Sequence, residues 1–170
     1  MAGTFKSLSF ALLNLNVVLF FIVIVFASWA ANYGIDRAYD EASNLMIPVR
    51  LFPIYFPIGN MATGFFTIYS LLAGIVGFTT SLVCIHNVFQ WDAPNLHSAA
   101  ASSMTTLSLS LLAMGLACKE INLGWTESNL RALEVTMILV TGTQLLCTGA
   151  IHSGLGEVEM GKMTVQGTHL

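Results

Sequence analysis

The stretch SLSFALLNLNVVLFFIVIVFASWAANYGI, residues 7–35, decides the fold of this chain, because it runs through five dozen backbone groups' worth of apolar helix-forming sequence without one charge. A helix needs about 20 apolar residues to cross the hydrocarbon of a bilayer. Further stretches without charge lie at 51–91, 93–118 and 135–156. A soluble core rarely sustains such helices four times over, so the sequence predicts four membrane spans.

The composition of the whole chain supports a membrane protein. Of the 170 residues, 55% are hydrophobic and 9% are charged, whereas globular domains carry about 25% charged residues. The net charge of −3 and the lack of a basic run argue against a nucleic-acid partner. The first apolar run is too long for a signal peptide and has no clear small-residue cleavage site, so we expect it to be retained.

We predict an all-α integral membrane protein: a four-helix transmembrane bundle formed by a single domain over residues 1–154. The predicted spans are about 8–29, 60–86, 96–117 and 131–152. Asp92 is expected to cap the third helix, with Pro94 in its first turn. A short interfacial amphipathic helix is predicted over 36–46, and a flexible polar tail over 155–170.

The segment FPIYFPIGNMATGFF, residues 52–66, combines aromatic side chains with Pro53 and Pro57 and holds no charge. Aromatic rings favour the membrane–water interface. A backbone broken by proline is not tolerated where it faces lipid, but it can lie at the interface or against protein. The segment is therefore predicted to be an interfacial lid over the bundle or, alternatively, an anchoring belt without a gating role.

Four phrases of this chain resemble the AWPM-like family, the abscisic-acid-induced wheat plasma membrane polypeptides. They are FPIYFPIGNMATGFF, QWDAPNLHSAAASS, LLAMGLACKEINLGWTESNLRALE and TGTQLLCTGAIHSG. The resemblance extends from about Leu13 to Gly154. It implies a plant plasma-membrane protein with four spans, expressed under abscisic acid, drought, cold or seed maturation, and a role in moving abscisic acid across the membrane. It carries no set of transport residues over to this chain.

An even number of spans places both termini on one side of the membrane, together with the connection between the second and third spans. This end gathers candidate proton-sensing residues: His86, Asp92, His97 and His152. Histidine changes charge near neutral pH, so these residues are candidates for sensing or relaying protons. Neutral imidazoles beside an acid can also bind a metal, but no HxxxH spacing supports this, and we predict no metal site. The simplest reading is that each histidine caps a helix or lies among headgroups.

The opposite end carries charged residues that are nearly balanced in sign: Arg37, Asp40, Glu41, Arg50, Lys119, Glu120, Glu127, Arg131 and Glu134. We expect ion pairs between the two connections at this end. As an alternative, Arg50 and Arg131 are candidates for contacting a carboxylate ligand, and Tyr55 for contacting its apolar body.

Polar residues also lie inside the predicted spans. The third span has Ser98, Ser102, Thr106 and Ser110 at four-residue spacing, and the fourth has Thr141, Thr143, Gln144 and Thr148. Hydroxyls can bond across helices that small residues such as Gly74 and Gly77 bring together. The alternative is a polar ligand path that Thr106 and Gln144 would line. No acid or base is expected at mid-depth, which argues against charge-coupled pumping. Gln144→Leu is expected to leave the protein folded.

The sequence contains no ATP-binding loop, nucleophile elbow or metalloprotease helix, so we predict neither an enzyme nor a cofactor. The leading prediction is a plasma-membrane facilitator of abscisic acid or a similar small amphipathic weak acid, with the substrate taken from the resemblance. The alternative is a non-transporting structural tetraspan that organises or protects the membrane under drought or cold. Its partners would be the lipid bilayer, this ligand and, as an open alternative, further copies of the chain.

Two signals conflict on the orientation of the chain. Across the first span, Lys6 precedes the helix and a mixed set of acids and Arg37 follows it, which favours a cytoplasmic N-terminus. The count of Lys and Arg over the whole chain favours the reverse. The first helix usually dominates, so we predict cytoplasmic termini.

Overall fold

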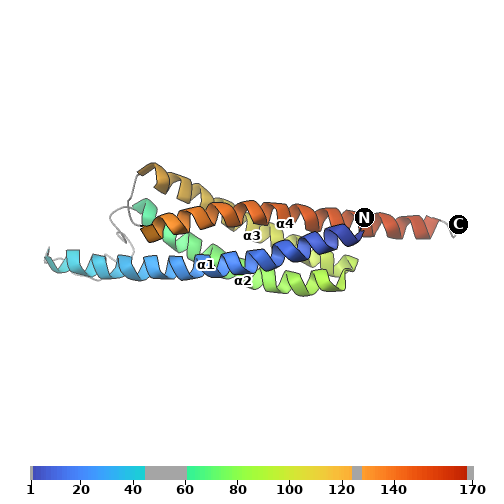
Figure 1. Cartoon of the computed structure of the whole chain (residues 1–170), viewed down its shortest axis with the longest axis horizontal. Helices are drawn as coiled ribbons and strands as arrows, with labels where there is room; N and C mark the ends of the chain where they lie inside the picture. The colour runs from blue at the N-terminus through green and yellow to red at the C-terminus, as the bar shows by residue number, and fades with distance from the viewer. Residues whose placement is uncertain (1, 45–60, 124–127, 168–170) are drawn as a thin grey trace.

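The computed structural model describes residues 2–44, 61–123 and 128–167 (Figure 1). This part of the chain consists of four helices: α1 Ala2–Asn44, α2 Met61–Gln90, α3 Ala93–Leu123 and α4 Ser128–Gly167. Each is long and apolar enough to cross a membrane, over the candidate spans Gly3–Asp36, Ala62–Gln90, Ala93–Asn122 and Ser128–Thr164. The predicted all-α bundle of four spans is confirmed.

The four helices form a four-sided bundle in chain order. Helix α1 packs against α2 and α4, and α3 packs against the same two helices. Consecutive helices run antiparallel, so the N-terminus and the link between α2 and α3 share one end of the bundle, here called the terminal end (Figure 1). The end of α3 and the starts of α2 and α4 form the other end, here called the connection end.

The outer helices are longer than the sequence predicted. Residues 36–44 continue α1 and do not form a separate interfacial helix, so that prediction is wrong. Residues 155–167 likewise continue α4 beyond the bundle and are not a separate tail (Figure 1). Hydropathy falls at these positions, but no proline interrupts either helix, and polar residues are compatible with a helix that leaves the membrane. The aromatic and proline-containing residues 52–60, with Arg50 and Tyr55, lie outside the described residues.

Two apolar clusters fill the interior. The cluster towards the connection end is centred on Phe20, Phe66 and Met137, and the cluster towards the terminal end on Leu13, Leu96 and Ile151. Large apolar side chains also cover the outside, where Val18, Phe21 and Leu146 are more than half exposed. Since lipid tails are as apolar as these side chains, association of the helices depends on close packing and on polar contacts between helices.

Two glycines allow the closest approach between helices. A Cβ atom on Gly77 of α2 would lie 2.4 Å from Cε1 of Phe20, which is fully buried on α1. A Cβ atom on Gly74 would lie 2.9 Å from Cγ1 of Ile24. The prediction that small residues of the second span let helices approach closely is therefore confirmed for α1 and α2.

The link between α2 and α3 consists of Trp91 and Asp92. The carboxylate Oδ1 of Asp92 accepts a hydrogen bond from the backbone N–H of Asn95 at 3.3 Å, so Asp92 caps α3 as predicted. Trp91 has a φ of 51°, in the left-handed region that permits the sharp reversal. Its ring lies against Gly154 of α4, where a Cβ atom would come within 2.7 Å of Cη2.

Candidate functional site

A layer of buried amide groups joins three helices inside the bundle. Nδ2 of Asn16 on α1 donates to Oε1 of Gln144 on α4 at 2.8 Å. Nε2 of Gln144 donates in turn to the backbone oxygen of Ser103 on α3 at 3.2 Å. All three residues are buried, and Oδ1 of Asn16 has no hydrogen-bond partner. We call these three residues the amide layer.

Hydroxyl groups extend this polar interior next to the amide layer. The hydroxyls of Thr80 on α2 and Thr106 on α3 lie 2.6 Å apart. The hydroxyl of Thr141 on α4 donates to the backbone oxygen of Ser110 on α3 at 3.2 Å, besides bonding within its own helix. Thr106 and Gln144, the two residues predicted to line a path, therefore both lie inside the bundle, within about one helical turn of Ser103.

Further buried hydroxyls without a partner lie on both sides of the amide layer. The contact of Asn16 with Gln144 sets the register of the antiparallel helices α1 and α4. Thr148, one turn further along α4, and Ser9, two turns earlier on α1, therefore lie between the amide layer and the terminal end. Ser70 lies on α2 towards the connection end. The hydroxyl oxygens of all three are buried without a partner, so polar groups recur along much of the bundle interior.

A carboxyl group is buried near the connection end. Glu120 of α3 has a fractional exposure of 0%. The hydroxyl of Thr63 on α2 donates to its Oε1 at 2.5 Å, and its Oε2 has no partner. The prediction that Glu120 belongs to an exposed connection is wrong, because α3 continues to Leu123 and turns this residue into the bundle.

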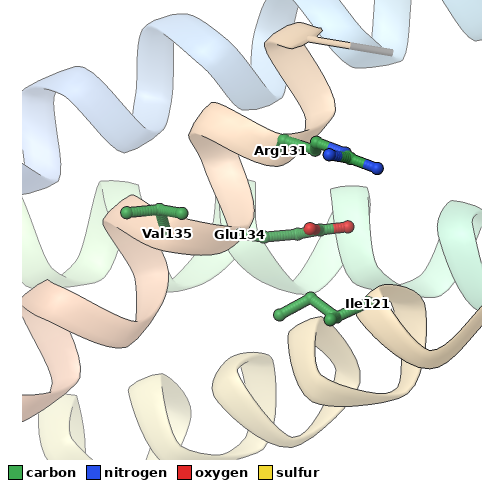
Figure 2. Close-up of a pocket in the computed structure, with 4 residues that line it drawn as sticks. All are labelled: Ile121, Arg131, Glu134 and Val135. Atoms are coloured by element: carbon green, nitrogen blue, oxygen red, sulfur yellow. The ribbon is translucent and has the colours of Figure 1, made fainter. Parts of the chain in front are cut away.

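A pocket of about 290 Å³ opens beside this carboxyl group. It is lined by Ile121 of α3 and by Arg131, Glu134 and Val135 of α4. Figure 2 shows the side chains of Arg131 and Glu134 extending from α4 in the same direction, with Ile121 across from them. Glu134 is also largely buried, with 5% of its surface exposed, and Arg131 and Glu120 both act on it electrostatically. The pocket thus combines apolar walls with a guanidinium and an acid, and it contains the predicted ligand-contacting residue Arg131.

The four candidate proton-sensing residues each make a separate contact. Nε2 of His97 lies 2.8 Å from Oε1 of Glu159 on α4, and Nδ1 of His152 lies 2.9 Å from the backbone oxygen of Thr148. His86 lies beside Gln90 at 3.4 Å, and Asp92 caps α3. Within the described ranges, no group of three or more His, Cys, Asp or Glu residues could hold a metal ion.

Sequence reasoning missed two parts of this site. The pairing of Asn16 with Gln144 needs the register of two helices that are far apart in the sequence. The burial of Glu120 had a local signal, because Ala113, Ala117 and Glu120 follow the four- and three-residue spacing of one helix face. A third omission is Lys6, whose Nζ donates to the backbone oxygen of Phe89 at 2.9 Å and so caps the end of α2.

The comparisons with known proteins agree with this architecture. The model of the AWPM-19-like family matches residues 14–154. The chain is 36% identical over 156 residues to the membrane protein PM19L of Oryza sativa subsp. japonica, an alignment that covers 91% of this chain and 83% of that protein. No solved structure matches. The resemblance seen in the sequence is confirmed: this chain belongs to the AWPM-19-like family of membrane proteins.

Proposed function

We propose that this protein facilitates the movement of abscisic acid, or of a similar small amphipathic weak acid, across the plant plasma membrane. The observation that carries the proposal is the polar interior, which extends from Ser9 through the amide layer to Glu120. Buried polar atoms without partners are costly in an apolar medium. Polar groups inside a membrane domain are functional candidates for that reason.

The pocket at the connection end suits the entry of such a ligand. A weak acid of this kind combines a carboxylate with an apolar body. The guanidinium of Arg131 can hold the carboxylate by charge-assisted hydrogen bonds, while Ile121 and Val135 offer apolar contact. Further inside, the amide layer closes the bundle, so passage requires the hydrogen bond between Asn16 and Gln144 to open.

The test is uptake of labelled abscisic acid into liposomes that contain only this protein. Because the neutral acid crosses lipid unaided, the criterion is saturation with concentration, measured against protein-free liposomes. We expect a saturable component from the protein. Uptake that is identical in both preparations would refute facilitation and favour a structural tetraspan.

Replacing Arg131 is expected to weaken ligand binding. Arg131→Gln should raise the KM of saturable uptake more than it changes the maximal rate, as expected when binding is lost. Loss of one hydrogen bond to a charged group costs about 1.5–3 kcal/mol, or roughly ten- to a hundredfold in affinity. Arg131→Lys should rescue only partly, since lysine lacks the planar fork. Lys119→Gln removes an exposed positive charge at the same end and serves as the control; an equal effect there would point to general electrostatics.

We also propose that the termini are cytoplasmic and that the connection end, with its pocket, faces outwards. A cysteine introduced at Ser43, near the end of α1, should then react with an impermeant maleimide in intact cells. Cys118 is exposed and should first be replaced by serine. Protection of the new cysteine until the cells are permeabilised would reverse the orientation.

A further inference from the structure

The carboxyl group of Glu120 has no role in packing the bundle that an apolar side chain could not fill. It is fully buried, one oxygen accepts a hydrogen bond from Thr63, and Oε2 has no partner. An ionised carboxylate in this position would keep one charged oxygen in an apolar interior without a donor, which is strongly unfavourable. A proton on the carboxyl group removes that charge.

The charges around Glu120 come from the helices packed against α3. Helix α4 contributes Glu134 and Arg131, the two groups that flank the pocket. Helix α2 carries no Asp, Glu, Lys or Arg over its residues 61–90, and its titratable side chain in this half of the bundle is Tyr69. Among these described groups, two carboxyls face one guanidinium. The site is neutral when the two carboxyls hold one proton between them and Arg131 remains charged.

A ligand carboxylate would change this balance. When an anion binds beside Arg131, the guanidinium positive charge is taken up by the ligand, and a second negative charge enters the site. Like charges in a shared site favour uptake of a proton by one of the acids. Anion and proton binding would therefore favour each other, by linkage.

We propose that Glu120 and Glu134 form a proton-binding site, and that binding of the weak-acid anion beside Arg131 is coupled to uptake of one proton by this pair. The coupling rests on the proposed transport function, whereas the proton-binding site itself does not. The proton comes from water at the connection end and adds to a carboxylate oxygen. One anion and one proton then carry no net charge into the bundle, and no other bond is formed or broken.

The proton site can be tested without transport. Dicyclohexylcarbodiimide reacts with carboxyl groups that carry a proton in an apolar setting, and the labelled residue can be found by peptide mass spectrometry. In the purified full chain we expect labelling of Glu120 or Glu134, decreasing from pH 5.5 to 8.5. Asp36, an exposed acid of α1, should remain unlabelled and is the control. Absence of label from both glutamates over the whole pH range would overturn the inference, even if uptake is saturable.

The coupling is tested with liposomes at a constant external pH of 5.5, so that the ligand species outside do not change. Passive trapping is subtracted with protein-free liposomes. The initial saturable rate should rise severalfold when the internal pH is raised from 5.5 to 7.5, and Glu120→Gln should lose this stimulation while Asp36→Asn keeps it. Unchanged stimulation in Glu120→Gln would overturn the coupling. Labelled glutamates in a protein without saturable uptake would support the proton site and refute the transport proposal.

Discussion

Gly77→Leu is expected to prevent the bundle from accumulating in its folded form. Any Cβ atom at this position would lie 2.4–2.5 Å from three ring atoms of Phe20, well inside van der Waals contact. The ring is fully buried and belongs to the apolar cluster that joins all four helices, so it has little room to move. Overpacking a well-packed core costs typically 1–3 kcal/mol and occasionally more, and a leucine adds three further carbons to the clash.

The measurement is thermal unfolding of the purified protein in detergent, together with the monodisperse fraction on gel filtration. Gly142→Leu is the matched control, because Gly142 is exposed on α4 and a Cβ atom there meets nothing within 4 Å. It should behave like the unmodified protein. Phe20→Ala in the Gly77→Leu background should restore part of the loss, since it removes the ring that the leucine meets. Equal unfolding temperatures for Gly77→Leu and Gly142→Leu would contradict the close contact of α1 with α2.

The span count could be predicted because a bilayer demands a minimum apolar length that four stretches of this chain meet. The ends of the helices could not be predicted in the same way. Hydropathy reports where a helix leaves the hydrocarbon, while helix formation continues as long as the backbone is not interrupted. Residues 36–44 and 155–167 are polar enough to leave the membrane but remain helical. Local capping chemistry was sufficient for Asp92, whose side chain and partner lie three residues apart.

The site could be predicted only in part, for a related reason. Arg131 was identified from its charge, and Gln144 and Thr106 from their polarity inside a predicted span. Whether such a group faces lipid, another helix or a pocket depends on helix rotation and on neighbours that are distant in the sequence. Glu120 shows the consequence: treating charged residues as markers of connections assigned it to the surface, although its spacing from Ala113 and Ala117 places it on the buried face.

The amide layer reverses the expectation for Gln144→Leu. Taken alone, Gln144 is a polar group in an apolar setting, and its replacement by leucine was expected to leave the protein folded. In the structure its removal takes away the acceptor of Asn16 Nδ2, whose Oδ1 already lacks a partner. Leaving a buried polar group unpaired costs about 1–3 kcal/mol, although hydrogen bonds inside membrane proteins average nearer ~0.6 kcal/mol. We therefore expect Gln144→Leu and Asn16→Leu each to lower the unfolding temperature.

The double variant Asn16→Leu with Gln144→Leu separates the packing role of the amide layer from its role in a path. Replacing both partners by apolar groups leaves no stranded amide and can be nearly neutral for stability, so its unfolding temperature should return towards that of the unmodified protein. If ligand passes through this layer, saturable uptake should stay low despite the recovered stability, because an apolar barrier now replaces the polar groups. A thermal-unfolding cycle of the four proteins, with uptake measured on each, gives both results. Stability losses that simply add would show that the two amides are not coupled. Recovered uptake in the double variant would mean that the amide layer only joins the helices and that the ligand passes elsewhere.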